Sequence, residues 1–331
     1  MVTMAEQDAN PTATEVANRY ATHIKDKTVL VTGASAKSLG AGFVEGIAPH
    51  GPRLIIIAGR TPSKVQQVVD DLATAHPGLA VRSLVFDFAS FEAVRSAAKE
   101  LNSWDDVPQI DVLVSSVGVM GLPWSTSPSG HEMQLATNHL GPFLFINLII
   151  GKVLASPAPR IVLISSDAHR LSPIRFGDIN FRNGMAYHPF SAYGQSKTAN
   201  ALMALSLADK LGKKHNLVSL SLQPGVSQET GLMTHMTWAG DYPSAQYLDR
   251  MLGNKSGWAE HPPLLPTPVV AGPYVYAAFD PQLNDHNGSY IDHYEVGSPW
   301  THILMPWATS SIEAERLWKL SEELVGEQFD Y

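Results

Sequence analysis

Short runs of apolar, often β-branched residues alternate along the chain with longer segments in which apolar residues recur every three or four positions. The short runs predict buried strands and the longer segments predict helices. Strands that are apolar along their whole length are typical of a parallel sheet covered by helices on both faces. We therefore expect an α/β fold: a single doubly wound Rossmann-type domain with a parallel sheet flanked by helices. The expected strands are 27–32, 53–58, 80–86, 110–115, 160–165 and 217–222, and the expected helices are 39–50, 62–75, 91–101, 131–155 and 191–211.

Two stretches were considered as targeting or membrane segments. The first 22 residues are polar and lack the apolar centre of a secretory signal, so we expect residues 1–22 to form a flexible N-terminal segment. The most apolar stretch, 143–154, is too short to span a bilayer and contains Asn147 and Lys152. It is interpreted as a buried helix, and no membrane span is predicted.

Composition narrows the possible partners. The 331 residues carry a formal net charge of −8 without a basic stripe, which argues against nucleic acid as the main partner. The chain contains no cysteine, which excludes disulfides and thiolate metal sites and is consistent with the cytoplasmic location that we expect. His131 and His139 are eight positions apart, and Leu135 stands where a His-Glu-x-x-His motif needs its second histidine, so no metal site is predicted.

A glycine-containing loop follows the first expected strand and ends at Gly40. Glycine at such a place lets backbone N–H groups approach a pyrophosphate at the start of the next helix. Ser38 stands where the usual dinucleotide-binding pattern has its middle glycine, so its hydroxyl either donates to a phosphate or displaces the cofactor. A glycine turn that binds no ligand is the alternative. The candidate cofactor contacts in this loop are Gly33, Ser35, Lys37, Ser38, Leu39 and Gly40.

The end of the second expected strand is basic. Arg60 and Lys64 follow it, Lys37 lies in the glycine loop, and no carboxylate occurs between Leu54 and Val69. Proteins that select NAD place Asp or Glu near this point to bind ribose hydroxyls, whereas cations here would bind the 2′-phosphate of NADP. We therefore predict NADP(H) as the cofactor in preference to NAD(H). The alternative is that Arg60 and Lys64 are solvated surface charges.

Tyr193 and Lys197 lie four positions apart in the expected helix 191–211, so they share one helical face. A cation beside a phenol favours the phenolate and is expected to lower the phenol pKa toward neutrality. Such a phenol can donate or accept a proton in carbonyl or alcohol chemistry. The spacing alone is a weak signal, because most such pairs are exposed, and it gains weight from the motifs that precede it.

Together these motifs resemble those of the short-chain dehydrogenase/reductase family. The resemblance implies that Tyr193 is the catalytic acid or base and that Lys197 lowers its pKa and binds the nicotinamide ribose. It implies that Asn138, in Thr-Asn-His-Leu-Gly-Pro, holds a water of a proton relay. Ser166, in Ile-Ser-Ser-Asp, matches the serine that orients the substrate, with Ser165 as the competing choice because consecutive strand residues face opposite ways.

The same resemblance covers residues 25–290 and implies further cofactor contacts. Asp87 matches the family's acidic contact to adenine, and the backbone around Val226, in Gln-Pro-Gly-Val, matches its contact to the nicotinamide carboxamide. Gly118 is retained in Ser115-Ser-Val-Gly, where the family usually has Asn-Asn-Ala-Gly. The packing on the adenine side therefore departs from the usual pattern.

Two segments place the chain within the family. Tyr193 follows Ser166 by 27 positions, about twice the usual gap, and the inserted run 173–181 resembles that of retinol dehydrogenases. The glycine loop looks most like that of reductases of fungal specialised metabolism. Residues 226–265, rich in Met, Trp and Tyr, fall where the family has its substrate lid, which implies a fairly hydrophobic substrate. A packed loop or a subunit interface is the alternative for this segment.

We therefore predict one dinucleotide-binding catalytic domain over 23–331, with a substrate lid around 226–265. It is expected to be an NADP-dependent oxidoreductase that interconverts a carbonyl and a secondary alcohol on a small molecule. By analogy with the family, it is expected to associate into dimers or tetramers. A non-catalytic NADP(H) sensor is one alternative, which the replacements at Ser38 and Ser115 keep open. A carbon–carbon double-bond reductase is another, which the four-residue spacing of tyrosine and lysine disfavours.

Overall fold

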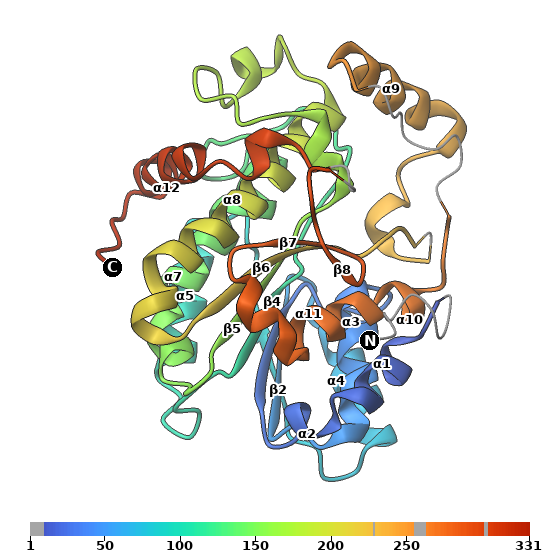
Figure 1. Ribbon diagram of the computed structural model, residues 1–331, viewed down its shortest axis with the longest axis vertical. Helices are drawn as coiled ribbons and strands as arrows, with labels where there is room; N and C mark the ends of the chain where they lie inside the picture. Colours follow the sequence, from blue (N-terminus) through green and yellow to red (C-terminus); the bar gives the residue numbers. More distant parts are fainter. Residues whose placement is uncertain (1–9, 228, 255–262, 301–303) are drawn as a thin grey trace.

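The computed structural model describes residues 10–227, 229–254, 263–300 and 304–331. Its centre is a sheet of eight strands in the order β3-β2-β1-β4-β5-β6-β7-β8 (Figure 1). All neighbouring strands pair in parallel except β7 and β8, which are antiparallel. The strands are β1 (Thr28–Thr32), β2 (Leu54–Gly59), β3 (Val81–Val85), β4 (Val112–Ser115), β5 (Arg160–Ile164), β6 (Val218–Gln223), β7 (Tyr290–Asp292) and β8 (Glu295–Val296).

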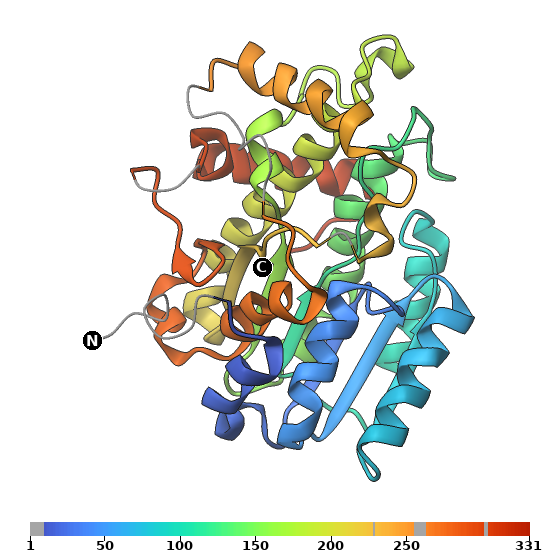
Figure 2. The same cartoon turned by 90° about the vertical axis from the view of Figure 1, so that its right-hand side faces the viewer.

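Helices cover both faces of this sheet, because alternate side chains of each apolar strand enter two different cores (Figures 1 and 2). Leu30 belongs to one core, and its neighbours Val29 and Val31 belong to the other. The first core includes α5 (Phe91–Asn102), α7 (Gly141–Leu154), α8 (Pro189–His215) and α12 (Ser311–Val325), and the second includes α3 (Leu39–Ile47), α4 (Pro62–Ala75) and α11 (Gly272–Phe279). The predicted doubly wound α/β fold is confirmed.

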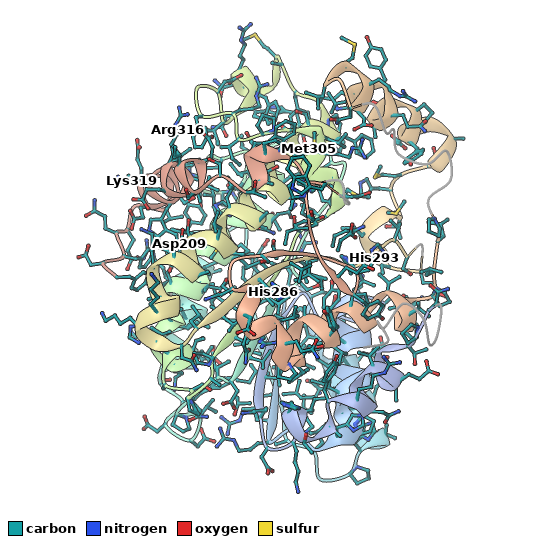
Figure 3. The ribbon with its side chains drawn as sticks, viewed as in Figure 1. Asp209, His286, His293, Met305, Arg316 and Lys319 are labelled. Atoms are coloured by element: carbon teal, nitrogen blue, oxygen red, sulfur yellow. The ribbon has the colours of Figure 1, made fainter. Side chains whose placement is uncertain are left out.

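The C-terminal helix α12 completes the first core. Leu317 and Trp318 are buried against it, whereas Arg316 and Lys319 lie at the edge of the molecule in Figure 3. Neither this helix nor the short strands β7 and β8 were predicted. The two strands are only three and two residues long, whereas the helical spacing of Ala314, Leu317 and Trp318 behind the N-cap Ser310 was a signal that the prediction overlooked.

The flexible segment predicted for residues 1–22 is wrong from residue 13 onward. Helix α1 (Ala13–Arg19) begins with a capping box, in which Thr12 and Glu15 exchange hydrogen bonds with each other's backbone N–H. Val16 is fully buried, and α1 packs against α3 and α11; α2 (Ala21–Ile24) follows. The spacing of the cap and of the buried residues was the signal that the prediction overlooked. Residues 1–9 lie outside the described part of the chain.

The apolar stretch 143–154 is a buried helix, as predicted, with Phe143 and Ile146 fully inside the first core. Among the described residues, one helical stretch, Met133–Leu154, is long and apolar enough to cross a membrane by length and composition. It is a core helix by its packing, since 83% of its most apolar part is buried inside the protein. It consists of α6 (Met133–Leu135), a π-helical turn (Ala136–Leu140) and α7.

The predicted lid is only partly described, because residues 228 and 255–262 lie outside the described ranges. The described part contains α9 (Trp238–Met251), which lies above the carboxyl ends of the strands beside the segment inserted before α8 (Figure 1). Beyond it, α10 (Thr267–Val270) leads into α11.

Candidate active site

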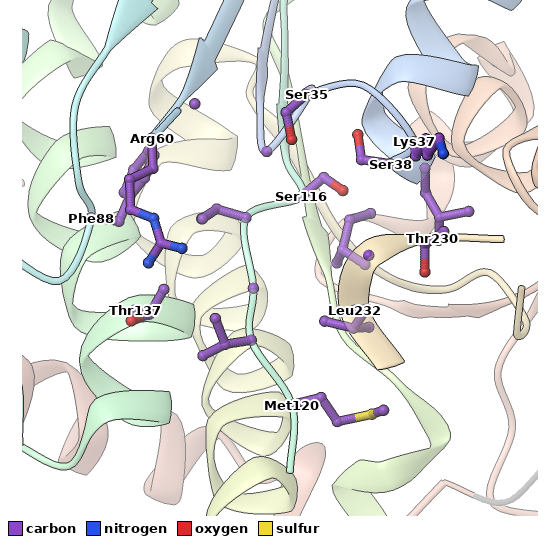
Figure 4. A pocket seen from close by; sticks show the side chains of 18 of the residues that line it. Ser35, Lys37, Ser38, Arg60, Phe88, Ser116, Met120, Thr137, Thr230 and Leu232 are labelled. Atoms are coloured by element: carbon purple, nitrogen blue, oxygen red, sulfur yellow. The ribbon is translucent and has the colours of Figure 1, made fainter. Parts of the chain in front are cut away.

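A cavity of about 430 Å³ opens at the carboxyl ends of β1, β2, β4, β5 and β6 (Figure 4). Ligands of open α/β sheets bind at this edge, where the strand order reverses, and here the reversal lies between β1 and β4. The predicted site residues that line the cavity are Gly33, Ser35, Lys37, Ser38, Leu39, Arg60, Lys64, Asp87, Gly118, Ser166, Tyr193 and Lys197. Gly40, Asn138 and Val226 do not line it.

The glycine loop approaches the next strand closely. Gly33 has a φ of +71°, and a Cβ at this position would lie 2.7 Å from the backbone of Val117. Lys37 also has a positive φ, of +63°, a conformation that a lysine rarely adopts and that occurs most often at functional sites. Gly40 lies behind the wall, and a Cβ at this position would lie only 3.0 Å from the Cα atom of Ala34.

Ser38 is the N-cap of α3. Its hydroxyl oxygen accepts a hydrogen bond from the backbone N–H of Ala41 at 3.1 Å, and the side chain also lines the cavity. Because the oxygen acts as an acceptor here, the hydroxyl proton stays available for another partner. Where the usual dinucleotide-binding pattern has a glycine, this chain therefore has a serine that caps the N-terminus of α3 and faces the cavity.

The basic residues at the end of β2 are exposed on the cavity wall. Arg60 and Lys64 are exposed there, and Asp87 is the one acidic side chain among the described lining residues. In Figure 4, Arg60 extends into the cavity from the side of β2, whereas Lys37 lies across the view beside Ser38. Lys37 therefore does not join Arg60 in one cluster, although Lys64 is linked to the loop by its carbonyl, which accepts from Ala36 N–H at 3.1 Å.

Tyr193 and Lys197 lie on the buried face of α8, 6% and 4% exposed. The Lys197 Nζ atom is 5.4 Å from the centre of the Tyr193 ring and donates to the carbonyl of Ile164 at the end of β5, at 2.9 Å. Gly118 faces this pair, and a Cβ there would lie 3.7 Å from Lys197 Nζ. The sequence placed these two side chains together correctly.

The pKa of Tyr193 shifts in the direction opposite to the one expected. Burial, and secondly the negative charge of Asp167, raise the pKa of Tyr193, although the nearby hydroxyl of Ser166 opposes them. Burial also lowers the pKa of Lys197 to about 8. Removal of the phenol from water penalises the phenolate more than the neighbouring ammonium stabilises it. The spacing of the pair predicts their contact but not their burial.

Ser166, rather than Ser165, faces the phenol. Ser166 lies close enough to Tyr193 to lower the pKa of the phenol, and its hydroxyl donates to Asp167 Oδ1 at 3.1 Å. Ser165 directs its hydroxyl to the carbonyl of Lys197, at 2.8 Å. The alternation of neighbouring strand residues decides between them as the sequence anticipated.

Asn138 lies behind the cavity wall in the π-helical turn, a feature that is common at functional sites. Its Oδ1 accepts from Val119 N–H at 2.7 Å, and its Nδ2 donates to the Val119 carbonyl and to Ser196 Oγ, both at 2.9 Å. Pro142 has no N–H to offer the Asn138 carbonyl four positions before it. The Asn138 side chain therefore holds the loop after β4.

Comparisons with known proteins agree with this arrangement. A family model described as short chain dehydrogenase matches residues 27–178. The chain is 31% identical over 312 residues to retinol dehydrogenase 14 of Mus musculus, covering 91% of this chain and 86% of that protein. It is 29% identical over 339 residues to oxidoreductase calI of Penicillium decumbens, covering 96% and 93%. The chain belongs to the short-chain dehydrogenase family.

The solved structures agree with the fold of this short-chain dehydrogenase. The crystal structure of an uncharacterized protein from Mycobacterium paratuberculosis matches with a TM-score of 0.62 and 26% identity, covering 94% of this chain and 98% of that one. The likeness to retinol dehydrogenases and to fungal oxidoreductases confirms the predicted branch of the family. The protein is thus an enzyme of a family that uses nicotinamide cofactors.

Val226 lies outside the cavity of this short-chain dehydrogenase. Its carbonyl accepts from Leu265 N–H at 3.0 Å in an isolated β-bridge, whereas the residues just before it, Gln223, Pro224 and Gly225, line the cavity. Of this motif, the cavity wall therefore takes Gln223, Pro224 and Gly225 but not Val226. The bridge pairs Val226 with Leu264, a tertiary contact that the motif does not reveal.

The sequence analysis missed a pair of hydroxyls in the wall. Ser116 Oγ and the phenol oxygen of Tyr274 are 2.9 Å apart, and both side chains line the cavity. In such a pair one hydroxyl donates to the other, and the acceptor keeps its own proton for a ligand. Ser116 lies within a motif that the sequence analysis did single out, but Tyr274, on α11, carried no local signal.

Proposed function

We propose that this enzyme is an NADP-dependent oxidoreductase that interconverts a carbonyl and a secondary alcohol on a fairly hydrophobic small molecule. The observation that carries the proposal is that Tyr193, Lys197 and Ser166 line the same cavity as the glycine loop. A dinucleotide held by that loop would bring its nicotinamide to the three side chains. The nicotinamide cofactor, when bound, supplies or accepts the hydride.

The loop fits a dinucleotide phosphate. The backbone at Gly33 approaches the next strand too closely for any side chain, and the N-terminus of the nine-residue helix α3 opens onto the cavity with the Ser38 hydroxyl beside it. Arg60 and Lys64 on the same wall provide charge for a 2′-phosphate, which supports NADP over NAD.

Tyr193 acts as the proton donor when a carbonyl is reduced. Because burial raises its pKa, the phenol is protonated at neutral pH and its proton is available for the carbonyl oxygen. Ser166 donates a hydrogen bond to the same oxygen as negative charge develops on it. Lys197, with a pKa near 8, is mainly an ammonium at pH 7 and favours negative charge on the phenol after it has given up its proton.

The substrate end of the cavity favours an apolar molecule. Met120, Leu122 and Leu232 line it, and Met120 also packs with Met236 and the buried Ala245 around Tyr193. Such a wall stabilises an apolar group next to the carbonyl and offers few polar partners to a charged one. The segment around 226–265 thus serves as a substrate lid over one catalytic domain.

The test is turnover with NADPH and with NADH on a panel of aliphatic and aromatic aldehydes and ketones, for the natural enzyme and for Tyr193→Phe. The variant keeps the ring and loses the proton, so we expect turnover to fall by about 10²- to 10⁴-fold while NADPH binding, followed by nucleotide fluorescence, changes little. Tyr247→Phe is the matched control, because Tyr247 is 66% exposed on α9.

Two results would contradict the proposal. Near-normal turnover in Tyr193→Phe removes the proposed proton donor. Tight NADPH binding without turnover of any carbonyl compound would instead identify a nucleotide sensor, the alternative that shares this fold.

A further inference from the structure

The lid helix α9 is joined to the segment that follows Ser166 by a buried ion pair. Arg170 lies in the 3₁₀ helix Asp167–Leu171 (η4), and Asp249 lies in the last turn of α9. The Arg170 Nε atom donates to Asp249 Oδ1 at 2.6 Å, and Nη2 donates to Oδ2 at 3.0 Å. Each side chain is 1% exposed. This is a two-pronged contact between a guanidinium and a carboxylate, with defined direction as well as charge.

A third side chain completes the contact. Asn254, just beyond α9, donates from Nδ2 to Asp249 Oδ1 at 2.7 Å and to the Arg170 carbonyl at 3.4 Å. The end of the lid helix is therefore fixed to the backbone of η4 as well as to its side chain.

Little else of α9 is buried. Of its described side chains, only Ala245 and Asp249 are buried, and they lie one turn apart on the same face. On the outer face, Tyr247 and Met251 are about two-thirds exposed. One alanine contributes little apolar area, and the contact of His188 Nε2 with Ser244 Oγ is at the exposed edge. Among the contacts described for this helix, the ion pair is the one that is fully buried and polar.

The segment on the other side of the pair is rigid. The Nδ1 atom of His169 lies 2.7 Å from the Ser166 carbonyl, and Thr198 on α8 donates to the carbonyls of His169 and Ser172 at 3.1 and 2.7 Å. Arg170 therefore projects from a backbone segment that is hydrogen bonded to α8, the helix that carries Tyr193 and Lys197.

We propose that Arg170 and Asp249 are positioning residues that hold α9 behind Tyr193 and Met120 and so support the apolar wall against which the substrate binds. Met120 and Tyr193 line the cavity, and Ala245 and Leu248 of α9 pack behind them in the same apolar cluster. Loss of either charge leaves the other buried without the opposite charge that it faces here, and α9 then leaves the body so that the remaining charge reaches water. The role in turnover rests on the proposed function, whereas the docking of α9 does not.

The primary experiment is residue-resolved hydrogen exchange on Asp249→Asn, with Arg250→Gln as the matched control, because Arg250 is the exposed neighbour on the same helix. We expect amide exchange in 238–251 to become at least tenfold faster while the strands β1, β4 and β5 keep their protection. The control should leave both regions unchanged. NADPH affinity, measured by nucleotide fluorescence, should stay within twofold, because no described residue of α9 lines the cavity.

The catalytic arm uses whichever aldehyde or ketone of the panel the natural enzyme turns over best. Asp249→Asn should raise the KM for this substrate at least tenfold and change kcat by less than threefold. The reason is that Tyr193, Lys197 and Ser166 lie on α8 and after β5, which the substitution does not move. If the pair served only the stability of the whole fold, exchange would instead become faster throughout the core, and kcat would fall without a selective rise in KM.

Two further variants keep the proposal testable if Asp249→Asn does not fold. Arg170→Lys retains a charge without the two-pronged geometry, so it should accelerate exchange in 238–251 by less than loss of the carboxylate would. Arg170→Met with Asp249→Leu removes both charges and should restore protection of α9 by packing. Unchanged exchange of α9 in Arg170→Lys would overturn the proposal, even if the enzyme turns over no carbonyl compound.

Discussion

The two ends of the cavity hold their charged groups in opposite ways. At the end of β2, Arg60 and Lys64 stand in water on the cavity wall. At the end of β5, Tyr193 and Lys197 are buried, and burial shifts the pKa of both groups toward the neutral form. An exposed cation can bind a phosphate without having first lost its hydration in a buried site. The pKa of a buried group, by contrast, is set by the residues around it.

The difference suggests how each end contributes. Under the proposed function, the basic end would select NADP through charges that salt can screen. The buried end keeps a phenol protonated and a lysine close to losing its proton, so small changes in packing change its chemistry. Substitutions should therefore act strongly and without salt dependence at the buried end, and weakly and with salt dependence at the exposed end.

The largest effect in this comparison is expected for Ser166→Ala. Loss of a hydroxyl aimed at the developing negative charge should lower turnover by about 100-fold, since one such donor is commonly worth 10² to 10³ in rate. Ser165→Ala is the matched control, because its hydroxyl is bonded to the Lys197 carbonyl, and it should cost less than about tenfold. Steady-state kinetics of both variants measure this. A larger loss in Ser165→Ala would reverse the assignment of the two serines.

The next largest effect is the pH dependence of stability that Lys197 causes. Burial lowers the pKa of Lys197 from the ordinary 10.5 to about 8. Below pH 8 both the folded and the unfolded protein carry the ammonium, so its burial lowers stability by the full amount. Between pH 8 and 10.5 the unfolded chain binds a proton that the folded protein has released, so stability rises with pH.

Relative to Lys197→Met, the natural enzyme should therefore gain about 2 kcal/mol of unfolding free energy between pH 7.5 and 9.5. Urea unfolding at a series of pH values measures the difference. Lys99→Met, at an exposed lysine of α5, should show no such trend. A constant difference between the natural enzyme and Lys197→Met would mean that water reaches the ammonium.

The smallest effect is expected at the exposed end. Arg60→Gln should weaken NADPH binding by about tenfold, the usual value of a charge-assisted hydrogen bond that water partly replaces. NADH binding should change by less than twofold, and the loss for NADPH should shrink in 0.5 M salt. Fluorescence titrations of both nucleotides measure these constants. An equal loss for both nucleotides would show that Arg60 does not contact the 2′-phosphate.

Sequence reasoning succeeded where the signal is local. The strands β1 to β6 are continuous apolar runs, and the candidate residues follow them directly, so most of those residues meet at one edge of the sheet. It failed at α1, where a cap and a helical spacing were present but short. It also did not anticipate that Val226 lies outside the cavity, because the bridge from this residue to Leu264 depends on how a distant segment folds back.

The order of apolar strands and helices, the glycine turn and the shared face of Tyr193 and Lys197 were fixed by the sequence itself, because each depends on residues only a few positions apart. Only the tertiary structure decided how deeply that pair is buried, and therefore the direction of the pKa of Tyr193. It alone joined Arg170 to Asp249, 79 positions away, and Ser116 to Tyr274, 158 positions away. Burial and long-range pairing arise when separate elements exclude water together, and no local pattern records which elements those are.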